Sequence, residues 1–461
     1  MNKDRFLPFK NFSISRELML DLNRVILGSG LGMVFFSTYN GAPFAGFVRS
    51  LGVGDFLFGV LMAFPVMGGL FQVLSAYVLE RSRQRKKLFL ISGVIQRISI
   101  IPMVLFAYIL PSELKPLSIG LIMFMLTLSA LGGSFNGVTF FSWMSAIVPI
   151  NIRGRFFSKR QLIFTITSLL GGLGVGYLLD LIGGSTGFII VFVIAAIFGL
   201  LDVACFVKVA DPPMDMPEDE KSISLIKVWK EALGNSGFRK YITFWALWTF
   251  AVNLTGPFFN DYMIHYLNMG YLQITLFTSA IYSLFTVFSI GRWGRLIDKY
   301  GNKPVMYICG LAVFLIPFMW IFTTPNFTLM IIFIHILSGV FWCGMELTAN
   351  NMTLSTSPEK NKSFYIATIS MVTALAGSIL AYFTGGLFME LTRGYISSLN
   401  IMLLGYPVNS YHLLFLIGSL LRGAAVIFLL PMVEETDSKS PHMLVKDTYK
   451  QMTQKIRGPR F

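Results

Sequence analysis

Twelve apolar runs, each long enough to cross a lipid bilayer as a helix, constrain this sequence more than any other feature. A bilayer core about 30 Å thick requires roughly 20 apolar residues per helix. Such runs occur at about 20–48, 55–80, 87–110, 116–148, 161–183, 187–209, 241–267, 272–296, 304–324, 327–356, 363–392 and 409–431. Continuous runs of this length exclude a β-barrel, whose strands alternate over about ten residues. We therefore predict an all-α membrane protein with twelve transmembrane helices.

The composition agrees with this class and argues against an enzyme. The chain is 54% hydrophobic and only 13% charged, about half the charged fraction of an average soluble protein. Cys205, Cys309 and Cys343 stand singly within apolar runs and are expected to be buried apolar residues. The four histidines are isolated, and no phosphate loop or serine elbow is present. We expect no enzyme activity, no metal and no cofactor.

Lysine and arginine indicate the orientation, because cations near helix ends stay on the cytoplasmic side. With both termini cytoplasmic, all but six of the 37 Lys and Arg residues lie in cytoplasmic segments. Arg24, Arg97 and Arg422 fall within helices, and Arg49, Lys115 and Arg393 fall outside. The net charge of +14 is then explained by anionic membrane lipids, without a nucleic acid. We predict a multi-pass protein of the plasma or inner membrane.

A polar segment divides the twelve predicted helices into two sets of six. Residues 210–240 are predicted to form a cytoplasmic linker, with a short amphipathic helix at 223–233. The predicted domains are an N-terminal bundle (1–209), this linker, a C-terminal bundle (241–431) and a cytoplasmic tail (432–461).

The two sets of six share a repeated loop motif. After the eighth predicted helix the chain carries Gly294, Asp298, Lys299, Gly301 and Lys303. The same spacing after the second predicted helix gives Ala76, Glu80, Arg81, Arg83 and Arg85. A small residue permits close helix packing, an acid can cap a neighbouring helix, and the cations hold the turn at the headgroups. A charged turn that only sets topology would contain similar cations.

With this motif between the eighth and ninth helices, the sequence resembles the major facilitator superfamily of transporters. The second copy matches the family pattern G-x-x-x-D-R/K-x-G-x-R/K. The first copy is degraded, with Ala76 for the first glycine, Glu80 for the aspartate and Arg83 for the second glycine. The resemblance implies two pseudo-symmetric six-helix bundles that work by alternating access. It also implies that Glu80 and Asp298 latch the cytoplasmic side, and that helices 1, 4, 7 and 10, with 2, 5, 8 and 11, line a central cavity.

Polar residues on the helices expected to line the cavity are candidates for substrate binding or coupling. They are Tyr39, Asn40, Asn136, Trp143, Trp248, Asn253, Asp261, Glu346, Asn350 and Asn351. Glycine and proline follow Asn40 and Asn253, so we predict breaks in both the first and the seventh helix.

Glu346 is the preferred coupling or substrate-contact acid. It lies one helical turn from Asn350, on the same face. An unpaired carboxylate there would be able to bind and release a proton, but a structural carboxylate bonded to neighbouring helices is an equal alternative. For Asp261, an outer-gate or solvated role is preferred over substrate contact.

Other charges within the predicted helices look structural. Asp21 and Arg24 are three positions apart and can pair on one helix. Arg97 and Asp202 are predicted to neutralise each other, since an isolated charge would be costly. No partner is predicted for Arg422.

The substrate class rests on weaker signals. Drug:proton antiporters of the family have a glycine-proline motif in helix 5, whereas LLGGLGVGYLLD at 169–180 contains no proline. The amides expected in the cavity suit a hydroxylated or zwitterionic solute. We therefore expect a monomeric secondary transporter for a sugar or similar metabolite, with proton coupling as an option. Drug or lipophile export and a non-transporting receptor are the alternatives.

Overall fold

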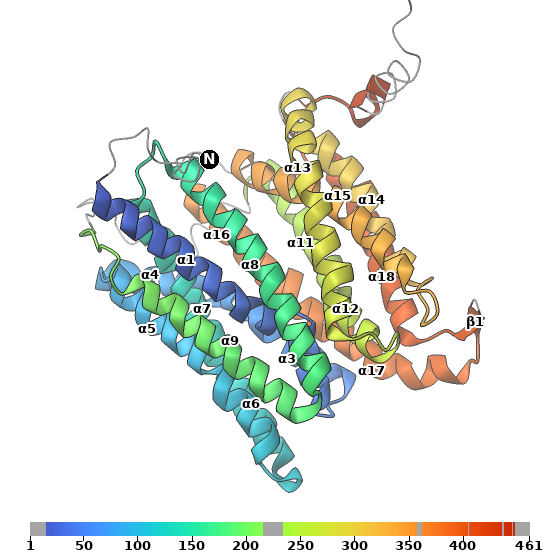
Figure 1. Cartoon of the computed structure of the whole chain (residues 1–461). Coiled ribbons are helices and arrows are strands. Elements are labelled where there is room, and N and C mark those ends of the chain that lie inside the picture. The colour runs from blue at the N-terminus through green and yellow to red at the C-terminus, as the bar shows by residue number, and fades with distance from the viewer. Residues whose placement is uncertain are drawn as a thin grey trace, which may run out of the picture. The chain divides into compact units, whose positions relative to one another are not determined.

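The computed structural model describes residues 15–214, 234–356, 362–403, 405–435, 438–444 and 446–447 (Figure 1). These residues contain twelve helices long and apolar enough to span a membrane, which is the number predicted. The amphipathic helix predicted at 223–233 lies outside the described residues.

The first of two compact units contains Met1–Phe44 and Phe71–Pro217. In it, α1 packs along α8 and α9, and α5 packs along α7. An aromatic core holds α5, α7 and α9 together, with Phe89 and Phe206 ring centroids 4.5 Å apart. The helices of this unit are α1 (Arg16–Tyr39), α4 (Gln72–Ser82), α5 (Arg85–Ile98), α6 (Ile100–Ile109), η3 (Ser112–Leu114), α7 (Lys115–Ile147), α8 (Arg153–Ile182) and α9 (Gly184–Phe206).

The second unit contains Ala45–Leu70 and Glu218–Phe461. The segment 45–70 precedes the linker in sequence, yet its helix α3 packs along α17. The elements of this unit are α2 (Ala42–Ser50), which starts in the first unit, α3 (Asp55–Met67), η2 (Gly68–Phe71), α11 (Ser236–His265), α12 (Tyr271–Thr275), η4 (Leu276–Ala280), α13 (Ile281–Tyr300), α14 (Asn302–Trp320), α15 (Leu329–Ser355), α16 (Lys362–Ala374), η5 (Leu375–Ile379), α17 (Leu380–Ser398), β1 (Met402–Leu403), β2 (Tyr406–Pro407), α18 (Ser410–Ala424), η6 (Ala425–Leu429) and η7 (Leu430–Met432).

Of the two predicted helix breaks, one is confirmed and the other is wrong. The first helix ends at Tyr39, and α2 begins at Ala42. The seventh, α11, continues through Pro257 to His265. A proline removes one backbone hydrogen bond, and packed neighbours within a membrane protein can compensate for that loss. Here Gly385 of α17 packs so closely that a Cβ would lie 2.6 Å from the Leu254 carbonyl oxygen.

The predicted start of the fifth span is also corrected. The fifth apolar run was predicted to start at about residue 161, but α8 begins at Arg153 and includes residues 153–160. The Arg160 guanidinium donates to Ser29 Oγ at 2.8 Å and lies 4.5 Å from the Phe140 ring centroid. Long cationic side chains can lie along a helix bundle in this way, so charge alone did not mark the helix boundary.

Three spans of the second unit contain a π-helical turn, in η4, η5 and η6. Such turns change the hydrogen-bond register and often occur at functional positions. In η5, the Gly377 carbonyl accepts a hydrogen bond from Asn253 Nδ2 of α11 at 2.7 Å. The π-turn thus gives α11 a polar contact with the eleventh span.

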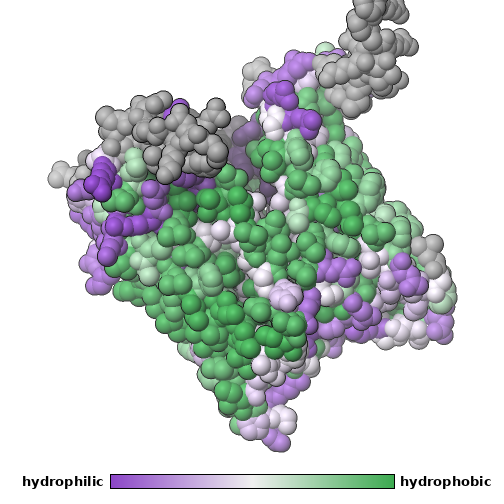
Figure 2. All heavy atoms as spheres, in the orientation of Figure 1, coloured by the Kyte–Doolittle hydropathy of each residue, from purple (hydrophilic) through white to green (hydrophobic). Residues whose placement is uncertain are grey.

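The surface pattern agrees with membrane insertion. Figure 2 shows hydrophobic residues along the sides of the helices and hydrophilic residues gathered toward their ends. Leu170 of α8 and Val287 of α13 are 62% and 68% exposed. Exposed leucine and valine on a helix side are expected where the solvent is lipid.

Candidate functional site

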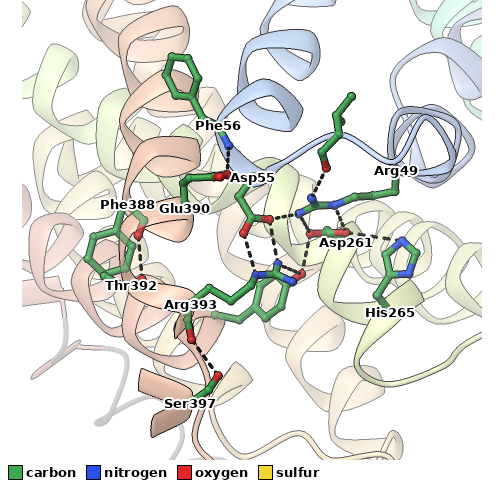
Figure 3. Close-up of polar contacts among 12 residues, drawn as sticks. Arg49, Asp55, Phe56, Asp261, His265, Phe388, Glu390, Thr392, Arg393 and Ser397 are labelled. Carbon is green, nitrogen blue, oxygen red and sulfur yellow. Dashed lines mark hydrogen bonds and ion pairs between the residues drawn. The ribbon is translucent and has the colours of Figure 1, made fainter. Parts of the chain in front are cut away.

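Five side chains, all buried or half-buried except Arg393, form a polar cluster within the second unit (Figure 3). We name it the outer cluster, because it lies where the topology predicts the outer membrane face; it consists of Arg49, Asp55, Asp261, Arg393 and Tyr411. Arg49 lies in the last turn of α2 and Asp55 begins α3, so both precede the linker in sequence. The other three come from α11, α17 and α18, which follow it.

Two bidentate arginine–carboxylate pairs form the centre of the outer cluster. Arg49 Nε and Nη2 donate to the two oxygens of Asp261 at 2.8 and 2.5 Å. Arg393 Nη2 and Nε contact the two oxygens of Asp55 at 2.8 and 2.7 Å. Arg49 Nη2 also donates to Asp55 Oδ1 at 2.6 Å, which joins the pairs. Bidentate pairs are the strong, geometrically specific form of this interaction.

Burial makes these pairs more significant than a surface contact. The Asp261 side chain has no exposed surface, while Asp55 and Arg49 are 6% and 11% exposed. Tyr411 donates to Asp261 Oδ2 at 2.6 Å. Burial disfavours the Arg49 cation, but its hydrogen bonds with Asp261 raise its pKa above the ordinary value. Each acid is therefore matched by a cation, and separating either pair would leave a poorly solvated carboxylate. Arg393 is different, because its side chain is 52% exposed.

Local backbone features bring Asp55 to this position. Gly52 has φ +62 and lies in the turn after α2. Glu390 of α17 accepts the Phe56 backbone N–H at 3.2 Å, which satisfies one of the unpaired donors at the start of α3. Figure 3 shows Glu390 beside this helix start, next to Asp55.

Two glycines let α3 and α17 approach closely below the outer cluster. A Cβ on Gly59 would lie 2.4 Å from the Tyr382 carbonyl oxygen. A Cβ on Gly386 would lie 2.8 Å from the Asp55 carbonyl oxygen. Backbone contacts this close require glycine at both positions.

Sequence reasoning found only part of the outer cluster. Asp261 was predicted as a candidate with an outer-gate or solvated role preferred, and its fully buried side chain shows that the solvated alternative is wrong. Asp55 and Tyr411 were not selected. A signal was present: Arg49 and Arg393 are two of the three cations that the predicted topology leaves outside. Cations against the positive-inside trend therefore marked the cluster.

Three of the predicted candidates make structural hydrogen bonds. Asn136 donates to the Phe89 carbonyl at 3.2 Å, and Trp143 Nε1 donates to the Ala210 carbonyl at 2.8 Å. Asn253 Nδ2 donates to Gly377, as described above, and to Ser378 Oγ at 3.2 Å. These contacts satisfy the side-chain donors within a single unit.

Three further candidates differ in environment. Tyr39 is buried, with its ring stacked on Phe35 at 5.5 Å between centroids. Asn40 is exposed at the end of α1 and donates to the Phe36 carbonyl at 3.4 Å. Trp248 is 1% exposed and packs against Trp342 of α15.

Glu346, the preferred coupling acid, lies in the middle of α15 and is exposed. Tyr282 of α13 lies beside it, and Glu346 forms no ion pair with any residue that the structure describes. Asn350, one turn further, is also exposed. Asn351 belongs to a different contact, because its Nδ2 donates to Asn302 Oδ1 at 2.9 Å at the start of α14. Glu346 and Asn350 are therefore exposed residues on one face of α15.

The cytoplasmic motif is seen in both copies, each within its own unit. Arg83 and Gly301 occupy matching positions and both have positive φ, +55 and +91. Lys86 Nζ donates to the Val209 carbonyl after α9, and Lys303 Nζ donates to the Pro431 carbonyl in η7, both at 2.8 Å. The turn thus repeats at matching positions. The lysine contact is similar in the two halves, although Lys86 lies one position beyond Arg85, the residue that matches Lys303.

The acids of the motif are not engaged in this structure. Glu80 and Asp298 are exposed, and neither makes a hydrogen bond or ion pair with a described residue. Of the other motif residues, Ala76 lies on α4, and Gly294 and Lys299 lie on α13. Arg81 donates to the Tyr77 hydroxyl at 3.3 Å. Arg85 Nε donates to Ser142 Oγ of α7 at 3.0 Å.

The predicted ion pairs inside the first unit are confirmed. Arg97 Nη2 contacts Asp202 Oδ2 at 2.8 Å, and Arg24 contacts Asp21 at 2.8 Å. Arg422, for which no partner was predicted, is buried and donates to Thr255 Oγ1 of α11 at 3.0 Å. A hydroxyl cannot be recognised from the sequence as the partner of a cation.

An apolar cavity of about 390 Å³ lies in the first unit among α1, α8 and α9. Its lining includes Leu27, Val34, Ile163 and Ile194, and Thr167 is its one hydroxylated side chain. A site with this lining would favour an apolar ligand over a sugar.

Comparison with known proteins assigns the family. The sequence profile of the Major Facilitator Superfamily matches residues 25–277 and 247–451. The chain belongs to this superfamily. It is a multi-pass integral membrane transporter rather than an enzyme, as predicted.

Similar proteins within the superfamily differ in what they carry. A multi-drug resistance efflux pump, PmrA of Streptococcus pneumoniae, is 28% identical over 166 residues, which cover 35% of this chain and 39% of that pump. Solved structures of the nucleoside transporter NupG and the xylose transporter XylE from E. coli have TM-scores of 0.70 and 0.64. NupG is 15% identical, and its alignment covers 90% of this chain and 100% of NupG. XylE is 18% identical, and its alignment covers 92% of this chain and 99% of XylE. These structural likenesses establish the fold.

Proposed function

We propose that this superfamily member is a secondary transporter that moves a small polar solute by alternating access, with a sugar or similar metabolite as the first candidate. One observation carries the proposal: the outer cluster is fully paired while both motif acids have no described partner. In this account the outer side is latched and the cytoplasmic latch is released. Both termini are placed in the cytoplasm, and one chain is the working unit.

The outer cluster suits a gate because of the residues it joins. Arg49 and Asp55 come from the first six spans, and Asp261 and Arg393 come from the last six. Opening the outer side would separate them and hydrate each charge. Buried pairs hold strongly when intact yet give little net stability over the hydrated state, so two states close in free energy are possible.

Glu346 is proposed as the coupling acid. It lies in mid-span beside Tyr282 without an ion-pair partner among the described residues, so it can take up a proton without leaving a cation unpaired. Asn350, on the same face, can donate and accept hydrogen bonds with a hydroxylated solute. NupG and XylE, which share this fold, are a nucleoside transporter and a xylose transporter, and this supports a polar solute.

The test is uptake into proteoliposomes that contain the purified full-length chain. Labelled xylose and uridine are the polar probes, and ethidium is the lipophilic probe, each with and without an inward proton gradient. We expect a polar probe to accumulate with the gradient, and Glu346→Gln to reduce uptake to the rate seen without one. Gradient-driven uptake that is unchanged in Glu346→Gln would remove Glu346 from the coupling role.

Export of an apolar compound is the second candidate. The apolar cavity among α1, α8 and α9 and the partial similarity to PmrA favour it. Movement of ethidium with no movement of the polar probes would support this candidate. Binding of a probe without any flux would instead support the receptor alternative.

A further inference from the structure

The chain that follows the last span contacts the intact copy of the cytoplasmic motif. Glu435 accepts the backbone N–H groups of Asn302 and Lys303 at 2.9 and 2.7 Å, one on each carboxylate oxygen. The same carboxylate accepts Asn302 Nδ2 at 2.7 Å. Gly301, which precedes α14, has no side chain to cap the helix. Glu435 therefore supplies the cap and places a negative charge at the positive end of α14.

Further contacts fix the chain on the other side of Gly301. Lys439 N donates to the Tyr300 carbonyl at 2.9 Å, and the Tyr300 hydroxyl donates to Asp447 at 2.9 Å. Ser438 packs against the turn, 3.1 Å from the position of a Cβ on Gly301. In Figure 1 this segment is the red stretch beside the end of α13. We name Glu435, Ser438, Lys439 and Asp447 the tail contacts.

The degraded first copy of the motif has no such cap. Its turn residue Arg83 and the N-cap residue of α5, Gln84, provide no side-chain cap hydrogen bond. Lys86 donates to the Val209 carbonyl after α9, much as Lys303 donates to the Pro431 carbonyl. Among the described hydrogen bonds of α5, however, no acid caps the helix start as Glu435 caps α14. The acid cap therefore accompanies the copy that carries Asp298.

We propose that Glu435, with the other tail contacts, is a positioning residue for the cytoplasmic gate: it holds the α13–α14 turn in the conformation from which Asp298 can latch. This inference rests on the alternating-access function proposed above. Since Glu435 follows α18 and caps α14 of the same unit, the cap can persist while the gate opens and closes. It shapes the motif without being part of the latch.

The test compares Glu435→Gln with Glu434→Gln in the full-length protein. A glutamine offers only one oxygen, so one of the two backbone N–H groups would face an amide NH2. Glu434 is the matched control, because it is adjacent but pairs with Lys240. We expect amide hydrogen exchange at Asn302 and Lys303 to rise at least tenfold in Glu435→Gln and to stay unchanged in Glu434→Gln. A chain that ends at Val433 is the second variant and should behave like Glu435→Gln.

A gating readout separates positioning from local stability. Asp261→Asn should open the outer side and increase labelling of an outer cysteine, which requires the cytoplasmic gate to close. Adding Glu435→Gln should reverse that increase by more than half, and adding Glu434→Gln should not. Unchanged exchange, or raised exchange without this reversal, would overturn the positioning role. If Asp261→Asn alone has no effect, the proposed outer gate fails, and the exchange data alone then decide the tail proposal.

Discussion

Asp261 is the most constrained charged side chain of the outer cluster. Its carboxylate has no exposed surface and accepts hydrogen bonds from Arg49 and Tyr411, while His265 Nε2 lies 3.8 Å away. Hydrogen bonds to a charged group contribute about 1.5–3 kcal/mol each, more than neutral ones. A change in charge at this residue should therefore alter the stability of the outer-closed state.

Replacing Asp261 with Asn should weaken the closed outer side. The amide keeps the shape but removes the negative charge, so the attraction to Arg49 falls by about 1.5–3 kcal/mol. The experiment uses a chain whose three native cysteines are replaced and which carries a single cysteine at Phe56. We expect an impermeant maleimide to label this cysteine at least about tenfold faster in Asp261→Asn than in the chain that keeps Asp261. Glu390→Gln is the control, since its amide oxygen can still accept the Phe56 N–H. Equal labelling of the two variants would argue against Asp261 as a gate residue.

At the scale of helices, α3 and α17 are held together by glycine as well as by charge. Gly59 and Gly386 remove the side-chain layer between the helices, so backbone atoms meet directly. An added methyl group at either glycine must therefore push α3 and α17 apart. Helix packing and the outer cluster therefore stabilise the same closed arrangement.

Gly59→Ala should destabilise that arrangement. Its Cβ would lie 2.4 Å from the Tyr382 carbonyl oxygen, and overpacking of this kind costs about 1–3 kcal/mol. We expect faster labelling of the outer cysteine and a lower melting temperature. Gly137→Ala is the matched control, because no atom lies within 4 Å of its Cβ position. The same labelling rate in both alanine variants would show that close packing of α3 on α17 does not hold the outer side shut.

At the scale of the whole molecule, the two compact units do not follow the order of the chain. Residues 45–70 group with the helices after the linker, although the repeat pairs them with the first half. A transporter that alternates must break this association once per cycle. A covalent link across it should therefore stop transport.

Cysteines at Phe56 of α3 and Phe383 of α17 test this consequence, since the two rings lie 6.4 Å apart. A short, reducible thiol cross-linker between them should abolish uptake of the solute found in proteoliposomes, and a reductant should restore it. The control pair is Phe106 and Ser118, on α6 and α7 within the first unit. Full transport with α3 and α17 cross-linked would exclude the proposed outer gate.

Sequence reasoning predicted local features well and the candidate site only in part. The twelve spans, the repeated turn and the Arg97–Asp202 pair follow from hydropathy, spacing and the cost of isolated charge. The continuity of α11 through Pro257 and the helical start of α8 depended on neighbours that hydropathy does not report. The roles proposed for Glu346, Asn350 and the other polar candidates stay predictions.

What the sequence determined by itself was the membrane class, the number of helices and the duplicated plan, because bilayer thickness and backbone hydrogen bonding leave a long apolar run almost no alternative to a helix. Only the tertiary structure decided which charges form the outer cluster and the cap of α14. Arg49 and Asp261 are 212 positions apart, and Glu435 reaches the start of α14 from 133 positions away. Such pairs form where packing brings buried charges within hydrogen-bond distance, and no local pattern of residues encodes that proximity.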